Sequence, residues 1–282
     1  MADFFLWELE NMKTVFITGA SSGIGAALAE HYASQGARLG LVARRQDMLE
    51  QLRLRLPHAD NHRIYALDVT DHAALAAAAA DFISIAGKVN VVIANAGISV
   101  GTLTEYEGDM AVFARVMETN LIATVATFAP FIAHMKQYAM QEPCRLVGIG
   151  SVAGIRGLPG AGAYSASKAA IISYCESLRV ELRDSGIRVV TIAPGYIDTP
   201  MTRHNPYRMP FLMPVHAFAR AAIVTIDKGA SYRIIPWQMG IVAKILRMLP
   251  NSLYDPVSEK ALHKPRETAN ETKEFRGENH AD

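Results

Sequence analysis

The pattern with the clearest chemistry is a tyrosine followed four residues later by a lysine, Tyr164 and Lys168 in the segment YSASK. Residues four apart on a helix share one face, so the lysine ammonium can lie near the phenol. A free tyrosine has a pKa of about 10, and a nearby cation favours the phenolate. We therefore expect Tyr164 to act as a general acid/base, although Tyr/Lys pairs at this spacing are also common on helix surfaces.

Ser151 is the second candidate for chemistry, because it directly follows the apolar run RLVGIG (145–150). In open α/β sheets, ligands bind outside the carboxyl ends of the strands. A serine hydroxyl at that place can polarise a substrate carbonyl group. Ser151 and Tyr164 are thus the residues expected to contact the reacting part of a substrate.

A glycine-rich segment, TGASSGIG (18–25), lies between the first apolar run and a helical pattern. Glycines at this spacing allow a tight turn, a close approach to a pyrophosphate, and close packing of helix against strand. The helix N-terminal amides would face the anion. A glycine-rich turn without ligand is the alternative, but the strand before it and the helix after it favour a nucleotide site. The predicted phosphate-binding residues are Gly19, Ser21, Ser22, Gly23, Ile24 and Gly25.

The end of the second apolar run indicates which nucleotide binds. An acidic residue there would bind the ribose 2′-hydroxyl of NAD, but the sequence has Ala43, Arg44 and Arg45 instead. We therefore expect NADP(H). Arg44 is the stronger candidate for binding the 2′-phosphate, and Arg45 is equally well explained as a solvated cation. Asp68, followed by Val69, can accept a hydrogen bond from adenine or cap a helix.

These residues need a scaffold, and the apolar pattern indicates one. Short β-branched runs alternate with longer Ala-rich amphipathic stretches, which is typical of a parallel sheet buried on both faces. We predict an α/β fold: a Rossmann-like, doubly wound, mainly parallel seven-stranded sheet with helices on both faces. The predicted strands are 14–18, 38–43, 63–67, 90–94, 145–150, 187–193 and 232–235.

The domain organisation is expected to be simple. One domain covers 12–254, preceded by a leader (1–11) that is too short for a secretory signal, and either Met1 or Met12 can begin the protein. The region 255–282 is polar, lacks apolar periodicity and is predicted to be a disordered tail. The longest apolar stretches are interrupted by charges, so no membrane-spanning segment is expected.

Composition excludes some classes of function. The 282 residues contain 28 Lys and Arg against 27 Asp and Glu, and 50% are hydrophobic, so general disorder is excluded and no nucleic-acid partner is indicated. The two cysteines favour a reducing compartment and hence a cytoplasmic location. The histidines form no pair with ligand spacing, so we expect no metal site.

Together the motifs resemble the short-chain dehydrogenase/reductase family, in its single-domain NADP-preferring branch, over about residues 13–235. The order and spacing of TGASSGIG, Asn95-Ala96-Gly97, Asn120, Ser151, YSASK and Pro194-Gly195 carry this resemblance. It implies a catalytic tetrad of Asn120, Ser151, Tyr164 and Lys168. It further implies that Lys168 holds the nicotinamide ribose and that Asn120 orders a water linking the lysine to bulk solvent. The cofactor contacts that it implies are Asn95, Ala96, Gly97, Tyr164, Lys168, Pro194, Gly195, Ile197 and Thr199.

The glycine turn and the C-terminal third both depart from many family members. Ser22 stands where relatives acting on carrier-bound acyl groups have a basic residue, so the NADP prediction depends on Arg44 and Arg45. The segment after the seventh strand is similar to the subgroup that acts on lipid-like, steroid-like or other bulky carbonyl compounds. A Pro- and Met-rich stretch at about 198–215 lies where relatives have a substrate lid. Flexible side chains there suit an adaptable apolar pocket, and we expect Met201 and Tyr207 to contact substrate.

A helix is predicted at about 237–249, with a wide apolar arc broken by Lys244 and Arg247. Such a face must be covered by the domain, by a partner subunit or by a membrane interface. The domain or a homodimer or homotetramer contact is favoured. Peripheral membrane contact through 237–254 is the alternative.

The residues and the resemblance favour one function. We expect an NADP(H)-dependent oxidoreductase that interconverts a ketone or aldehyde and an alcohol on an apolar or bulky substrate, with Tyr164 as general acid/base. The alternative is a non-catalytic NADP(H)-binding sensor or scaffold, which would not need the tetrad. An epimerase or dehydratase is disfavoured, because such relatives generally have a different glycine spacing and a longer substrate domain.

Overall fold

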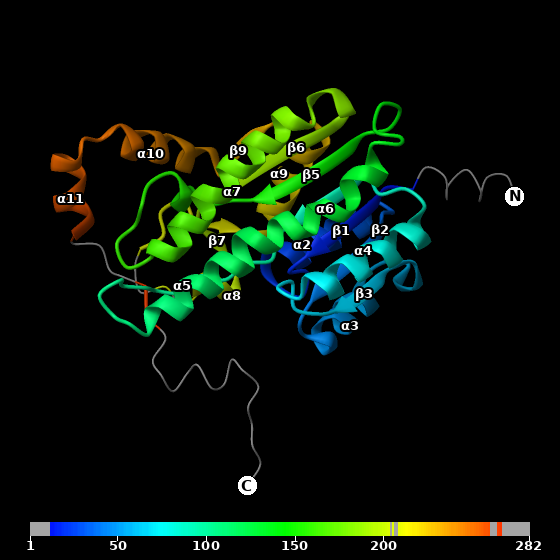
Figure 1. Cartoon of the computed structure of the whole chain (residues 1–282), viewed down its shortest axis with the longest axis horizontal. Helices are drawn as coiled ribbons and strands as arrows, with labels where there is room; N and C mark the ends of the chain where they lie inside the picture. The colour runs from blue at the N-terminus through cyan, green and yellow to red at the C-terminus, as the bar shows by residue number, and fades with distance from the viewer. Residues whose placement is uncertain (1–11, 204, 206–207, 260–263, 267–282) are drawn as a thin grey trace, which may run out of the picture.

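The structure is a computed structural model that describes residues 12–203, 205, 208–259 and 264–266 (Figure 1). The predicted leader (1–11), Tyr207 and most of the predicted tail lie outside the described residues.

The seven predicted strands form one sheet, and each strand end lies within one residue of its predicted position. The order is β3-β2-β1-β4-β5-β6-β9, and every neighbouring pair is parallel. The predicted doubly wound α/β fold is therefore confirmed. The strands are β1 (Thr14–Thr18), β2 (Arg38–Ala43), β3 (Arg63–Ala66), β4 (Val91–Ala94), β5 (Cys144–Ile149), β6 (Ile187–Pro194) and β9 (Tyr232–Ile235).

Helices cover both faces of this sheet. On one face, α2 (Gly23–Ser34), α3 (Gln46–Arg55) and α9 (Val215–Asp227) enclose an apolar cluster that includes Leu28 and Phe218. The other cluster, which includes Phe16 and Phe128, is covered by α4 (His72–Ala86), α6 (Ala123–Met135) and α7 (Gly162–Glu181). Two buried faces explain why the strands have near-continuous apolar sequences. Shorter helical turns are η1 (Ala59–Asn61), η3 (Val152–Gly154) and η4 (Arg183–Ser185).

One continuous helical stretch is both long and apolar. α5 (Asp109–Met117), the π-helical turn η2 (Glu118–Ile122) and α6 run together over Asp109–Met135, long and apolar enough to cross a membrane by length and composition. In the fold its fully buried side chains, such as Phe128 and Phe131, pack in the core beneath the sheet. The stretch is therefore a helical layer of this domain.

The strand order places a topological switch point between β1 and β4. The chain proceeds from β1 to β2 and β3 on one side, then returns to place β4 on the other side of β1. Ligands bind at such a switch point. The loops after the two strands are tied together, since Asn95 Nδ2 donates to the carbonyls of Thr18 (3.0 Å) and Gly19 (3.1 Å). Gly19 has a φ of 67°, and a side chain there would approach Ala96 Cα to 2.8 Å, so only glycine fits.

The C-terminal third adds small elements beyond the main sheet. The predicted lid region contains β7 (Ile197–Asp198), α8 (Pro200–Arg203) and β8 (Met213–Pro214), and β7 pairs with β8. Figure 1 shows α10 (Trp237–Met248) and α11 (Asn251–Glu259) together at one end of the molecule. α10 buries Met239 and Ala243 but leaves a row of large apolar side chains exposed. This row, the α10 face, consists of Trp237, Ile241, Ile245 and Met248, and the described part of the domain does not cover it.

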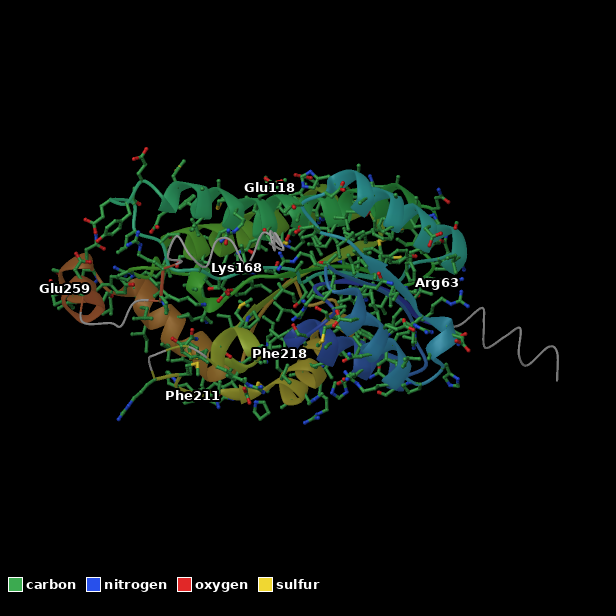
Figure 2. The ribbon with its side chains drawn as sticks, turned by 90° about the horizontal axis from the view of Figure 1, so that it is seen from below. Arg63, Glu118, Lys168, Phe211, Phe218 and Glu259 are labelled. Carbon is green, nitrogen blue, oxygen red and sulfur yellow. The ribbon has the colours of Figure 1, made fainter. Side chains whose placement is uncertain are left out.

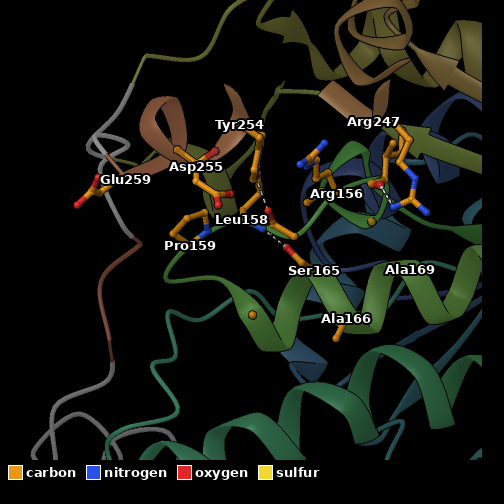
Figure 3. Close-up of a pocket in the computed structure, with 16 residues that line it drawn as sticks. Arg156, Leu158, Pro159, Ser165, Ala166, Ala169, Arg247, Tyr254, Asp255 and Glu259 are labelled. Atoms are coloured by element: carbon orange, nitrogen blue, oxygen red, sulfur yellow. Dashed lines mark hydrogen bonds between the residues drawn. The ribbon is translucent and has the colours of Figure 1, made fainter. Parts of the chain in front are cut away.

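The structure also differs from the predicted disordered tail. Residues 255–259 continue α11, and Lys264, Pro265 and Arg266 return to the domain. Single polar contacts hold α11: the guanidinium of Arg156 lies 3.8 Å from the ring centroid of Tyr254, and the Tyr254 hydroxyl donates to the carbonyl of Gly157 (Figure 3). Such contacts leave no apolar periodicity in the sequence, so the polar composition alone predicts disorder.

Candidate active site

A single pocket of about 1390 Å³ lies at the carboxyl ends of β1, β4, β5 and β6 and contains most of the predicted site residues. Gly25 and Asn120 lie behind its wall rather than on it, and Tyr207 is outside the described residues. The predicted residues that line it are Gly19, Ser21, Ser22, Gly23, Ile24, Arg44, Arg45, Asp68, Val69, Asn95, Ala96, Gly97, Ser151, Tyr164, Lys168, Pro194, Gly195, Ile197, Thr199 and Met201.

The glycine turn has the features of an anion site. Ser22 is the N-cap of α2 but its side chain makes no capping hydrogen bond, and the first turn of the helix has no acidic residue. The first N–H groups of α2 are therefore available to an anion, and the helix dipole favours negative charge there. Gly25 lets this helix approach the turn, because a side chain at Gly25 would collide with the carbonyl of Gly19. The turn thus fits a pyrophosphate group.

The two arginines occupy different places at the mouth of the pocket. Arg45 Nη2 donates to the hydroxyls of Ser21 (3.2 Å) and Ser22 (3.3 Å), which places its charge over the glycine turn. Arg44 Nη1 lies 3.8 Å from a carboxylate oxygen of Asp68. Both arginines line the same pocket as the glycine turn.

Asp68 follows β3 and does not cap the next helix. Its Oδ1 accepts from the backbone N–H (3.0 Å) and the hydroxyl (2.8 Å) of Thr70, while Asp71 is the N-cap of α4. The carboxylate is partly exposed on the pocket wall. It is therefore available to a ligand, as an adenine-binding role requires.

Tyr164 and Ser151 meet at the inner end of the pocket. Tyr164 lies in the first turn of α7, and its hydroxyl is hydrogen-bonded to that of Ser151. We expected Lys168 to lower the pKa of Tyr164, but burial dominates and raises that pKa, while the hydrogen bond with Ser151 opposes the rise. The phenol is consequently protonated at neutral pH and able to donate.

Lys168 lies one turn further along α7, in the interior of the molecule (Figure 2). Its Nζ donates to the carbonyl of Ile149 (2.8 Å) and lies 5.7 Å from the centroid of the Tyr164 ring. Burial lowers the pKa of Lys168 to about 8. The lysine can therefore gain or lose a proton near neutral pH, beside the tyrosine.

Asn120 is fully buried in the π-helical turn η2. Its side-chain amide forms reciprocal hydrogen bonds with the backbone of Ile98 (2.8 and 3.0 Å) and donates to Ser167 Oγ (2.9 Å). Asn120 thus ties the loop after β4 to α7. π-Turns of this kind are frequent at functional sites. The water-ordering role implied by the resemblance stays a prediction.

Sequence reasoning missed the residues at the substrate side of the pocket. Ser99 and Asp109 line it from the loop after β4 and the start of α5, and Arg266 lines it from the C-terminal segment. Lys264 hydrogen-bonds to Ser99. No motif marks these positions, because they are single polar residues in segments far apart in sequence.

Comparison with known proteins identifies the family. A family model described as short chain dehydrogenase matches residues 13–208. The chain belongs to the short-chain dehydrogenase family. An uncharacterized oxidoreductase of Myxococcus xanthus (strain DK1622) is 34% identical over 249 residues, which are 88% of this short-chain dehydrogenase and 97% of that relative.

Two further relatives carry more specific names. The 2-dehydro-3-deoxy-L-rhamnonate dehydrogenase (NAD(+)) of Sphingomonas sp. (strain SKA58) is 33% identical over 194 residues, covering 69% of this chain and 76% of that protein. The crystal structure of 3-ketoacyl-(acyl-carrier-protein) reductase from Brucella melitensis complexed with NADH superimposes with a TM-score of 0.73 at 26% identity, covering 79% and 96% of the two chains. This short-chain dehydrogenase is accordingly an oxidoreductase with a Rossmann-type nucleotide-binding fold.

Proposed function

We propose that this short-chain dehydrogenase is an NADP(H)-dependent oxidoreductase that interconverts a ketone or aldehyde and an alcohol on an apolar or bulky substrate. The observation that carries the proposal is that Ser151, Tyr164 and Lys168 meet at the inner end of the pocket whose mouth is the glycine turn. One cavity therefore joins an anion-binding turn to acid/base groups.

The chain's own residues supply proton transfer and orientation. The nicotinamide, when bound, supplies or accepts the hydride. The hydroxyls of Ser151 and Tyr164 are hydrogen-bonded to each other. When a substrate binds, each hydroxyl turns its one hydrogen to the substrate oxygen and donates to it instead. During reduction Tyr164 gives its proton to that oxygen, and Lys168, with a pKa of about 8, stabilises the phenolate that remains. Oxidation of an alcohol reverses these proton movements.

The charges at the mouth support the proposed preference for NADP(H). No acidic residue ends β2, and Arg44 and Arg45 lie there instead. The contacts of Arg45 with Ser21 and Ser22 bring a guanidinium to the rim of the phosphate turn. A guanidinium is suited to a 2′-phosphate, which it can bind with two parallel hydrogen bonds.

The apolar lining at the other end of the pocket supports the proposed class of substrate. Ile98, Val100, Val112 and Met201 line it there, and Met201 is partly exposed on α8. Apolar walls beside a few polar groups are usual for sites that bind small molecules of moderate size. An apolar or bulky carbonyl compound fits this lining.

The experiment that tests this function follows NADPH and NADH consumption against a panel of aliphatic, aromatic, steroid and acyl-thioester carbonyl compounds. We expect turnover of at least one class, with NADPH preferred over NADH. If the protein binds NADPH but turns over none of the panel, the sensor or scaffold function replaces the enzyme.

The α10 face supports a second proposal, that the protein works as a homodimer or homotetramer in the cytoplasm with this face at a subunit contact. Trp237 is 63% exposed and Met248 82% exposed. Monomeric soluble proteins rarely expose several large apolar side chains side by side. An anionic membrane is the other surface that such a face with nearby Lys244 would suit. Two experiments separate these possibilities: light scattering measures the size of the protein, and flotation tests its binding to anionic liposomes. Only a monomer that floats with the liposomes supports the membrane contact.

A further inference from the structure

The C-terminal segment Lys264–Arg266 is held against the substrate side of the pocket by its backbone. Gly101 N donates to the carbonyl of Pro265 (3.0 Å), and Gly101 pairs with Arg266 in a parallel bridge. A side chain at Gly101 would collide with the carbonyl of Lys264, so the loop after β4 accepts this segment only because it has glycine there. The segment is therefore docked at a fixed register.

A buried ion pair holds the end of the segment in place. Arg266 binds both carboxylate oxygens of Asp109 (2.8 and 2.9 Å), and the carboxylate is almost fully buried. The guanidinium also lies 3.5 Å from the centroid of the Tyr106 ring. A bidentate pair of this kind has strict geometry, so it orients the residues next to it.

The loop that receives the segment is also bonded to the start of α7, the helix that bears Tyr164. Thr102 N donates to the carbonyl of Gly160 (3.1 Å), and Ala163 N donates to the Thr102 hydroxyl (3.3 Å). Segment, loop and catalytic helix are thus linked by consecutive hydrogen bonds.

This arrangement brings Lys264 beside Tyr164 and Ser99, two residues that line the pocket. Lys264 Nζ donates to Ser99 Oγ (2.6 Å) and lies 5.8 Å from the centroid of the Tyr164 ring. Among the described residues no carboxylate pairs with Lys264, whereas Arg266 pairs with Asp109. Burial lowers the pKa of Lys264 to about 8, as expected for an ammonium with little compensation. Two of its three N–H donors are left for a ligand.

We propose that Lys264 binds a carboxylate of the substrate, and that the substrate is an oxo acid or hydroxy acid whose carboxylate is adjacent to the reacting carbon or one carbon further away. The inference rests on the proposed function, because it places the reacting oxygen at Ser151 and Tyr164. A carboxylate bound to Lys264 Nζ, which lies 5.8 Å from the centroid of the Tyr164 ring, can belong to the same small molecule as that oxygen. The apolar lining at Val100 and Val112 receives the rest of the molecule.

The test uses matched substrate pairs that differ only in charge, phenylpyruvate against its methyl ester and benzoylacetate against its methyl ester. The full-length protein is assayed with NADPH or NADH, whichever it consumes faster. The quantity compared is kcat/KM for the acid divided by kcat/KM for the ester. Lys264→Gln removes the cation, and Lys136→Gln, at an exposed position on the turn after α6, is the control for net charge.

We expect the wild type to favour the acid of at least one pair. Lys264→Gln should lower the acid-to-ester ratio on the order of 30-fold, the size of a lost hydrogen bond between charged groups, while Lys136→Gln leaves the ratio unchanged. Equal losses for acid and ester would overturn the inference, since a lysine that stabilises the Tyr164 phenolate acts on every substrate alike. A wild type that favours the esters would also overturn it.

Two measurements keep the outcomes separate. The melting temperature of Lys264→Gln shows whether the variant is folded, and titration with the cofactor shows whether it still binds the cofactor. A wild type that reduces other carbonyl compounds but neither acid contradicts this inference alone. A wild type that reduces no carbonyl compound contradicts the proposed function itself.

Discussion

The cofactor end and the substrate end of the pocket are built in different ways. At the cofactor end, the loops after β1, β2 and β4 are neighbours because their strands pair in the sheet, and the site needs glycines and backbone amides, as at Gly19 and the start of α2. At the substrate end, side chains hold together segments that are far apart in the sequence, such as Asp109 with Arg266 and Lys264 with Ser99. Backbone geometry therefore sets the cofactor site, and individual side chains set the substrate site.

The largest effect is expected where the two ends meet, in Tyr164→Phe. Loss of the proton donor should lower turnover by roughly 1000-fold, within the range of general acid/base catalysis, with NADPH affinity changed less than about threefold. Tyr232→Phe, at the amino end of edge strand β9, is the matched control and should stay active. Steady-state rates and fluorescence titration measure both quantities. A fully active phenylalanine variant would falsify the role of Tyr164.

At the cofactor end, Arg45→Ala should weaken NADPH binding on the order of 30-fold and NADH binding little, because the 2′-phosphate would lose a charge-assisted hydrogen bond. The sequence favoured Arg44, so Arg44→Ala is the informative companion. Affinities are measured by fluorescence titration at fixed salt, because exposed charges are screened. If both nucleotides weaken equally in both variants, the arginines do not select NADP(H).

At the substrate end, Asp109→Asn should raise KM for the carbonyl substrate roughly 5-fold to 10-fold while the cofactor affinity stays constant, because Arg266 loses its partner and the segment is less well oriented. The melting temperature should fall more than in Asp227→Asn, which breaks the exposed ion pair with Lys13. A change in cofactor affinity equal to the change in KM would mean that the two ends are not built independently.

The smallest effect concerns stability. Burial lowers the pKa of Lys168 to about 8 from an ordinary value of about 10.4, so its charged form destabilises the folded state most below pH 8. Lys168→Met should therefore melt higher than wild type at pH 7, and the difference should shrink as pH rises from 8 toward 10. A difference that is constant over this range would show that the cation is not destabilising in the fold.

The contrast between the two ends also explains what the sequence could predict. The strands were placed within one residue because buried parallel strands need continuous apolar runs, and the glycine turn was recognisable because its spacing follows from the turn geometry. Lys264 and Arg266 could not be found in this way. Their role depends on where a polar segment returns to the domain, which no local pattern records.

The raised pKa of Tyr164 shows the same limit within the site. Spacing alone correctly places Lys168 on the same face of α7, and it suggests a lowered tyrosine pKa. The direction of the pKa shift is decided by burial, which depends on how the chain packs around the tyrosine. Proximity of two residues can be read from sequence, but the dielectric environment around them cannot.

Hydride transfer between a nicotinamide nucleotide and a carbonyl carbon in this one pocket can be followed with an isotope. The wild type and Tyr164→Phe are reacted with NADPH that is deuterated at the transferring position of the nicotinamide, and the alcohol is analysed by mass spectrometry. We predict one deuterium on the carbinol carbon for each cofactor oxidised by the wild type, and almost no labelled alcohol from the variant, although it binds NADPH. NADPH bound by the wild type without label reaching any product, or label transferred equally well by the variant, would contradict the account.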